Sequence, residues 1–208
     1  MKADFLLAGV GGQGVVLTGD ILAEVGLRLR LDVKKADVHG LAQRGGAVEA
    51  CVRWGKLVNS PLIAAADFLL GLESLEAARC AARLRQGGVA LVNRHRLLPP
   101  GLSPADYPND EEVARRFAGK NLHWVDATAA AASLGNPILA GTVLLGHLSR
   151  FLPAEEAVWL SVLNEKVPPR HRETNLLAFR RGRDPAPGER DADKGTCANG
   201  QPGGPAPP

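Results

Sequence analysis

The chain lacks the cysteine patterns that mark disulfide-rich and cluster-bearing proteins. Its three cysteines, Cys51, Cys80 and Cys197, are far apart and odd in number, and none forms a C-x-x-C pair. A disulfide framework is therefore not expected. An iron–sulfur cluster needs about four thiolates, so the chain does not supply one alone. We expect Cys51 and Cys80 to be buried thiols, and we predict no metal site.

Aromatic residues, long apolar runs and excess charge are also scarce. Aromatics make up 4% of the 208 residues, so the core must rest on Leu, Val and Ala. The net charge of +3 is too small to indicate nucleic-acid or membrane binding. No apolar run approaches the roughly 18 residues of a membrane-spanning helix, and no signal-peptide pattern follows Met1. We expect one sizeable cytoplasmic domain with no nucleic-acid or membrane partner.

A strand, a glycine-rich loop and a helix are predicted over residues 4–27. The apolar run 5–8 fits a buried strand, and apolar residues recur at helical spacing from Val15 onward. This layout presents backbone N–H groups at a helix N-terminus, where the helix dipole also attracts phosphate or carboxylate. The candidate binding residues of this loop are Gly9, Gly11, Gly12, Gln13 and Gly14.

Two other interpretations of the glycine loop remain open. The spacing Gly9-x-Gly11-x-x-Gly14 satisfies the dinucleotide fingerprint, which also requires an acidic residue about 20 positions on. Asp32 and Asp37 lie in range, with two lysines between them. An NAD(P)-dependent oxidoreductase is thus one alternative, although no convincing catalytic residue accompanies the loop. In the other, the glycines only permit a tight turn and close strand–helix packing.

The rest of the chain alternates strand and helix patterns. Further strands are predicted over 31–38, 47–54, 67–72, 89–92 and 122–125. Helices are predicted over 75–86, 111–117, 127–134, 138–151, 153–165 and 173–179, and a short helical segment begins at Ser60-Pro61. This alternation predicts a three-layer α/β/α domain with a mostly parallel sheet. The connection between the second and third strands is too short for a crossover helix, which favours a mixed sheet with an antiparallel pair there. Ligands on such sheets bind beyond the carboxyl ends of the strands.

A second motif, His39-Gly40-x-x-Gln43-Arg44-Gly45-Gly46, joins those two strands. The Arg44 guanidinium can clamp a carboxylate or phosphate with two parallel hydrogen bonds. His39 titrates near neutral pH, so it is a candidate for proton transfer or for an interface. We add Gln43, Arg44, Gly45 and Gly46 to the candidate binding residues. The structural alternative is that Gln43 and Arg44 only tie down the loop or reach another subunit.

The two motifs together resemble a known family. GVGGQG after the first strand, KKADVHGLAQRGGAVEACVRWG, and SPLI at Ser60 to Ile63 are similar to the gamma-type domain of 2-oxoacid:ferredoxin oxidoreductases. The form HGLAQRGG is closest to the indolepyruvate branch, where such a chain is the beta subunit. Further similarity lies in Glu73-x-x-Glu76-Ala77, Asn136-Pro137, Gly146 and the stretch 173–179. The resemblance covers about residues 3–182.

The resemblance implies a function that the residues alone do not show. Members oxidatively decarboxylate a 2-oxo acid, here an aryl pyruvate such as indolepyruvate, to an acyl-CoA and pass the electrons to ferredoxin. Thiamine diphosphate and [4Fe-4S] clusters belong to the large alpha subunit, and coenzyme A is a co-substrate. The gamma-type chain carries no cofactor alone and completes the active site at the coenzyme A end. We therefore assign no catalytic residue to this chain.

Two alternatives to this subunit role remain open. A gamma subunit acting on pyruvate or 2-oxoglutarate is the alternative inside the family. A pure assembly module without a ligand is a separate class of alternative, like the NAD(P)-dependent oxidoreductase above. We expect the folded domain to span residues 1–182. Residues 183–208 are rich in glycine, proline and charge and have few apolar residues. They are predicted to be a disordered tail, to which we assign no role.

Overall fold

The computed structural model describes residues 1–39 and 45–184, with only the backbone described for His39. The strands are β1 (Ala3–Val10), β2 (Asp32–His39), β3 (Ala47–Gly55), β4 (Ala66–Gly71), β5 (Leu84–Asn93) and β6 (Asn121–Val125). The α-helices are α1 (Val15–Arg28), α2 (Ser74–Cys80), α3 (Asp110–Arg116), α4 (Ala127–Ser133), α5 (Ala140–Leu148), α6 (Glu156–Lys166) and α7 (Arg172–Arg183). Short 3-10 turns extend several of these helices, including Pro137–Leu139 before α5.

The described strands form one six-stranded mixed sheet in the order β2-β3-β1-β4-β5-β6. β3 is antiparallel to both of its neighbours, β1 and β2, whereas β1, β4, β5 and β6 are mutually parallel. The carboxyl ends of these parallel strands therefore meet at one edge of the sheet. From β1 the chain continues through α1 to β2 and β3, which lie on one side of β1 in the strand order. β4 lies on the other side of β1. The topological switch point lies between β1 and β4, where ligands bind in open α/β sheets.

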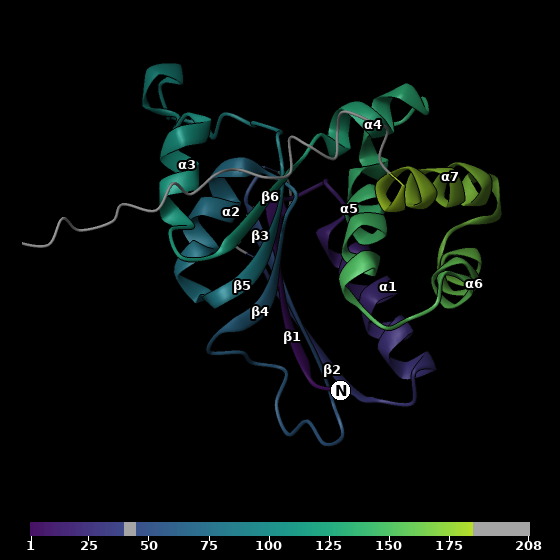
Figure 1. The fold of residues 1–208 in the computed structure, drawn as a ribbon. Coiled ribbons are helices and arrows are strands. Elements are labelled where there is room, and N and C mark those ends of the chain that lie inside the picture. Colours follow the sequence, from purple (N-terminus) through teal and green to yellow (C-terminus); the bar gives the residue numbers. More distant parts are fainter. Residues whose placement is uncertain (40–44, 185–208) are drawn as a thin grey trace, which may run out of the picture.

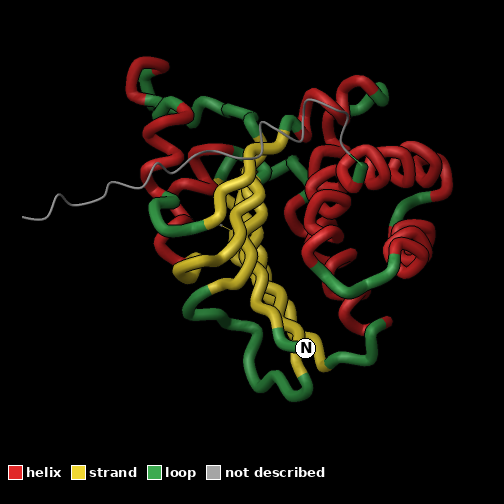
Figure 2. The backbone as a smooth tube through the Cα atoms, in the orientation of Figure 1, coloured by secondary structure: helices red, strands yellow, loops and turns green. Residues whose placement is uncertain are grey.

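The sheet is the middle of three layers, as the sequence predicts (Figures 1 and 2). Helices α2 and α3 cover one face, and α1 and α5 cover the other, with α6 and α7 packed outside them. β1 is buried on both sides because its alternate residues enter different cores. Phe5 and Leu7 pack with α1 and α5, whereas Leu6 and Ala8 pack with α2 and α3. A strand with helices on both faces needs such a continuous apolar run.

A buried carboxylate joins the strands at the opposite end of the sheet. Asp4 is 3% exposed, and its two oxygens accept hydrogen bonds from Arg53 of β3 (2.8 Å) and Arg85 of β5 (3.0 Å). Its backbone N–H donates to the Asp67 carboxylate on β4 (2.8 Å). The network therefore fixes four strands relative to one another, at the end of the sheet that is remote from the candidate site.

Two sequence predictions about local structure are wrong in instructive ways. The helix predicted over 75–86 ends at Cys80 and a short 3-10 turn, because Leu84 already pairs with Ala66 in the sheet. The short helix predicted to begin at Ser60 is absent, because residues 60–65, all of them described, form no helix. There, the carbonyl groups of Ser60 and Leu62 both accept hydrogen bonds from Arg53 (3.1 Å each) and are not free for a helical ladder.

Other predictions about this part of the chain are confirmed. β2 and β3 form an antiparallel pair. The thiols of Cys51 and Cys80 are free and buried, and burial raises the pKa of both, that of Cys80 to about 12. Within the described ranges, no helix is long and apolar enough to cross a membrane. The residues 185–208, including Cys197, lie outside the described part of the chain.

Candidate functional site

The two sequence motifs meet at the carboxyl edge of the sheet. The N–H of Gly11, in the loop after β1, donates to the carbonyl of Gly46 at the end of the second motif (2.9 Å). The sheet register also aligns them, since Val48 of β3 pairs with Gly9 on one side and with His39 on the other. The backbone of His39 is therefore two strands away from Gly9, roughly 10 Å at the usual strand spacing.

The loop glycines are required by close contacts and by left-handed backbone. A Cβ on Gly9 would lie 2.8 Å from the Gln13 Oε1 atom and 2.9 Å from a Val15 methyl group. Gly12 and Gly14 have φ values of +103° and +80°, which favour glycine. Gly14 occupies the N-cap position of α1 and provides no side-chain cap, and the first turn contains no acidic residue. The first N–H groups of α1 are therefore available to an anion.

Gln13 closes the crevice between β1 and β4 from within the loop. Its Oε1 accepts a hydrogen bond from the N–H of Val10 (2.8 Å), and its Nε2 donates to the carbonyl of Leu72 (3.3 Å). This side chain links the end of β1 to the end of β4 across the switch point. Gln13 therefore has a structural role in holding the loop in place, in addition to lining the cavity described next.

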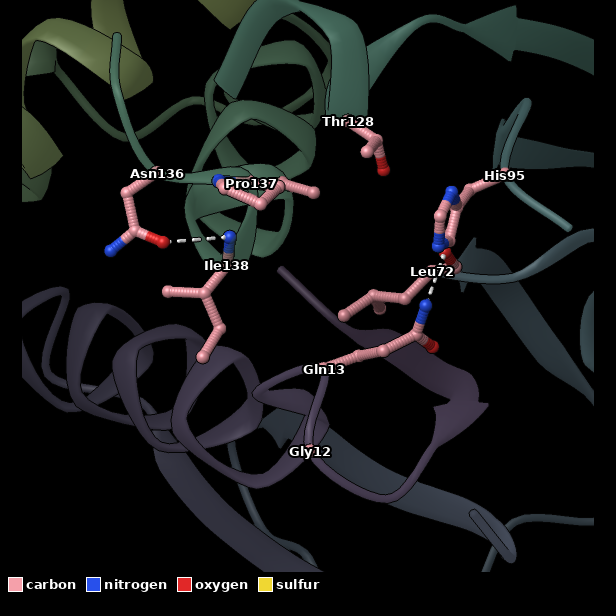
Figure 3. A pocket seen from close by; sticks show the side chains of 9 residues that line it. Gly12, Gln13, Leu72, His95, Thr128, Asn136, Pro137 and Ile138 are labelled. Atoms are coloured by element: carbon pink, nitrogen blue, oxygen red, sulfur yellow. Dashed lines mark hydrogen bonds between the residues drawn. The ribbon is translucent and has the colours of Figure 1, made fainter. Parts of the chain in front are cut away.

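A cavity of about 350 Å³ opens above this crevice (Figure 3). It lies where the loop after β1 faces the segments that follow β4, β5 and β6. Its volume is at the lower end of the usual range for ligand sites. The residues that line it are Gly12, Gln13, Leu72, His95, Thr128, Asn136, Pro137, Ile138 and Ala140.

The cavity has one polar and one apolar side. Thr128 and His95 face it from the segments after β6 and β5, and Gln13 lies below them (Figure 3). Ile138 and Pro137 form the other side, where Asn136 caps a 3-10 turn by accepting a hydrogen bond from the N–H of Ile138 (3.1 Å). None of the lining residues is Asp or Glu. The cavity therefore suits a ligand that combines hydrogen-bond acceptors or negative charge with an apolar part.

A second buried carboxylate holds the segment that carries His95. Glu73, 1% exposed, follows β4, and its carboxylate accepts hydrogen bonds from the N–H of Glu76 (2.8 Å), the N–H of Leu97 (3.1 Å) and the Tyr107 hydroxyl. The N–H of Ser74 also donates to the carbonyl of His95 (3.0 Å). Burial and the Glu73 carboxylate raise the pKa of Tyr107, so its hydroxyl stays protonated and can donate. These contacts fix one wall of the cavity.

The structure places the predicted site residues as follows. Gly12 and Gln13 line the cavity, Gly9 and Gly14 shape the loop, and Gly11 contacts Gly46. Gly45, with φ +75°, precedes β3. The predicted roles of Gln43 and Arg44 fall outside the described residues, as does the side chain of His39.

Sequence reasoning missed most of the cavity wall. It did not single out Leu72, His95, Thr128 or Ile138, all of which line the cavity. Leu72, His95 and Thr128 lie within three residues of a strand's carboxyl end. The only available signal was therefore position at or after the end of a strand, which Glu73, Asn93 and Asp126 share. Of those three, Glu73 and Asn93 are buried supports of the wall.

The geometry disfavours a dinucleotide site at the glycine loop. In a dinucleotide-binding sheet, the second strand neighbours the first and its terminal acid reaches the ribose. Here β3 separates β2 from β1. Of the two candidate acids, Asp37 pairs with Lys35 (2.5 Å), and Asp32 lies at the opposite end of β2, where it pairs with Lys34 (2.9 Å).

The donor set of the described residues does not fit a metal or an iron–sulfur cluster. Among residues 1–39 and 45–184, no group of three His, Cys, Asp or Glu side chains could hold a metal ion. The two thiols of this region have raised pKa values, which oppose the thiolate form that cluster ligation needs. We therefore assign no redox step to these side chains.

Comparison with known proteins identifies relatives over almost the whole described chain. Residues 4–184 match the family model described as pyruvate ferredoxin/flavodoxin oxidoreductase. The indolepyruvate oxidoreductase subunit IorB of Thermococcus kodakarensis is 34% identical over 190 residues, which cover 86% of this chain and 93% of that protein. The 2-oxoglutarate synthase subunit KorC of Methanothermobacter marburgensis is 27% identical over 195 residues, covering 88% and 96%.

A solved structure has the same fold. The pyruvate oxidoreductase subunit PORC of Thermotoga maritima superimposes with a TM-score of 0.69 at 22% identity, covering 87% of this chain and 94% of that one. The fold class predicted from the sequence is thereby confirmed. With the family model spanning residues 4–184 and a relative 34% identical over most of both chains, this chain belongs to the pyruvate ferredoxin/flavodoxin oxidoreductase family.

Proposed function

We propose that this chain is the non-cluster-bearing subunit of an indolepyruvate:ferredoxin oxidoreductase. In this role it completes the active site of a larger complex that converts aryl pyruvates to acyl-CoA with loss of carbon dioxide. The observation that carries the proposal is the 34% identity to an IorB subunit over 93% of that protein. The KorC relative, at 27% identity, supports a 2-oxoglutarate enzyme less well.

The cavity is the proposed site for part of coenzyme A. The Thr128 hydroxyl and the His95 ring line the cavity and offer hydrogen bonds to phosphate or amide oxygens, and α1 begins directly after the lining residues Gly12 and Gln13. Leu72 and Ile138 offer apolar contact to the remaining atoms. At about 350 Å³, the cavity suits one part of the molecule, and the rest would extend toward the partner. In this proposal, Gln43, Arg44 and Gly46 complete the anion-binding edge.

The partner supplies the redox chemistry in this proposal. Thiamine diphosphate on a large alpha subunit provides the decarboxylation chemistry, and the [4Fe-4S] clusters of that subunit pass electrons to ferredoxin. This chain binds and orients coenzyme A so that its thiol meets the reacting acyl group. Such positioning contributes several kcal/mol to lowering a barrier when the geometry is close to that of attack. The complex works in the cytoplasm.

Reconstitution with the large subunit tests the proposal. The chain is co-expressed with the thiamine-binding subunit, and coenzyme A-dependent reduction of ferredoxin is measured with indolepyruvate, pyruvate and 2-oxoglutarate. We expect activity only in the complex, with the highest kcat/KM for indolepyruvate. Turnover by the isolated chain would refute the subunit role. A higher kcat/KM for 2-oxoglutarate or pyruvate would instead favour the alternative substrate within the family.

Arg44 provides a sharper test of the coenzyme A edge. In the assembled complex, Arg44→Ala should raise the KM for coenzyme A about tenfold or more, because a charge-assisted hydrogen bond contributes about 1.5–3 kcal/mol. The thiamine and iron content should not change. Arg115→Ala, on the exposed surface of α3, is the matched control and should leave the KM unchanged. Equal KM values for both variants would contradict the proposed role of Arg44.

A further inference from the structure

A buried amide beneath the cavity has its orientation fixed by its partners. Asn93 ends β5 and is 1% exposed. Its Nδ2 donates to the carbonyl of Leu72 (3.0 Å) and to the Thr128 Oγ1 atom (2.8 Å), while its Oδ1 accepts from the N–H of Thr128 (3.1 Å). A carbonyl can only accept and a backbone N–H can only donate, so all three contacts agree on one orientation of the amide.

This orientation determines what the Thr128 hydroxyl can do. Because Nδ2 of Asn93 is the donor, the Thr128 oxygen accepts that hydrogen bond and keeps its own proton for another partner. No acceptor for this proton is present among residues 1–39 and 45–184. Other threonines of the structure use theirs: Thr18 donates to Gly14 and Thr174 to His171.

The Thr128 hydroxyl that carries this proton lies at the wall of the cavity. Thr128 is one of the lining residues, and Figure 3 shows its oxygen directed into the space between His95 and Ile138. The lining contains no carboxylate that could take the proton. An acceptor atom of a ligand that approaches Thr128 can therefore take this proton, because the contact with Asn93 uses one lone pair of the hydroxyl oxygen and leaves its O–H able to donate.

We propose that Thr128 is a binding residue whose hydroxyl, oriented by Asn93, donates a hydrogen bond to an acceptor oxygen of the coenzyme A portion held in the cavity. This inference rests on the proposed function, because coenzyme A is the ligand that it names. Acceptor oxygens with the required chemistry occur in the phosphorylated adenosine part of coenzyme A and in its pantetheine part.

The test compares three substitutions in the assembled complex. Dissociation constants for coenzyme A are measured by calorimetry for Thr128→Val, Thr128→Ala and Thr128→Ser. We expect Val and Ala to weaken binding about five- to tenfold and Ser to stay within about twofold of wild type, since only Ser keeps the hydroxyl. Thr128→Ala leaves room for a water molecule at the Asn93 amide. It therefore provides the measurement without the hydroxyl if the valine variant does not fold. Thr174→Val is the control for loss of a threonine hydroxyl on α7, away from the cavity, and should bind as wild type does.

A titration with a second ligand and one further variant complete the test. Repeating the titrations with pantetheine, which lacks the phosphorylated adenosine part, shows which part of coenzyme A Thr128 contacts. A loss seen only with coenzyme A indicates the phosphorylated adenosine part, and a loss with both ligands indicates the pantetheine part. Equal affinities of the Val, Ala and Ser variants would overturn the inference.

Ile138→Trp, which fills the cavity mouth, separates the two proposals. If Ile138→Trp weakens binding while Val and Ala do not, the coenzyme A site stands and the role of Thr128 fails. If Ile138→Trp leaves the affinity unchanged, the cavity is not the coenzyme A site and both proposals fail.

Discussion

The contact between α5 and α7 depends on two glycines that face each other's helix backbone. A Cβ placed on Gly146 would lie 2.0 Å from the carbonyl oxygen of Phe179, and one placed on Gly182 would lie 1.9 Å from that of Val143. A carbon–oxygen contact needs about 3.3 Å. Alanine at position 146 must therefore push the helices apart by more than about 1 Å, because a backbone carbonyl cannot rotate away as a side chain can.

We expect Gly146→Ala to destabilise the protein by about 2 kcal/mol. Overpacking of this kind costs about 1–3 kcal/mol, and the better helix propensity of alanine offsets at most about 1 kcal/mol. For a chain of this length, the loss corresponds to a melting temperature about 4–8 °C lower. Thermal unfolding followed by circular dichroism measures it.

Gly19→Ala is the matched control, because it makes the same change in α1. There the nearest atom to the added carbon is Cε of Lys35 at 2.8 Å, near the far end of a flexible side chain whose ammonium group pairs with Asp20 and Asp37. Its melting temperature should remain within about 2 °C of wild type, since the lysine can move and helix propensity improves. If Gly146→Ala melts as high as Gly19→Ala, the close approach of α5 and α7 does not limit stability and the reasoning is wrong.

Two further substitutions test the buried carboxylates. Asp4→Asn should lower the free energy of unfolding, measured with urea, by about 2 kcal/mol. This loss is smaller than for a fully buried ion pair, because both arginine partners are partly exposed. Asp110→Asn, in an exposed pair, is its control and should cost under about 0.5 kcal/mol; similar losses for the two would contradict the network's role. Tyr107→Phe removes a hydrogen bond to Glu73 and should speed amide hydrogen exchange over residues 94–107, the segment that carries His95. Unchanged exchange there would show that this contact does not hold the cavity wall.

The sequence predicts the parts of the fold that local patterns control. The apolar run of β1 and the helical spacing of α1 lead to the correct elements, and the glycines between them lead to the correct loop. The short link after β2 correctly favours an antiparallel β2–β3 pair. What local patterns do not contain is the position of β3 between β2 and β1. It arises from pairing between residues far apart in the sequence, such as Ala3 with Trp54.

The errors have the same origin, because long-range contacts override local preference. The run 75–86 has helical spacing, but its last residues are taken by the β5 ladder with β4. Ser60 and Pro61 form a typical helix start, but Arg53, anchored by Asp4, binds the carbonyl groups of the segment instead. The cavity wall was missed for a related reason. Leu72, His95 and Thr128 carry no motif and acquire a role only when three strands end side by side.

The glycine fingerprint has a different meaning here from the one that its spacing suggests. In this loop, Gly9 must be small because the Gln13 amide and Val15 occupy the space beside it, and Gly14 has a left-handed backbone at the N-cap position of α1. Gln13 bridges the ends of β1 and β4, so the crevice between these strands is partly filled by the protein itself. What the loop shares with dinucleotide sites is a helix N-terminus with free N–H groups, and these recognise an anion without recognising what carries it. The selectivity must therefore come from the opposite wall, where Asn93 fixes the donor at Thr128 and Ile138 sets the apolar side.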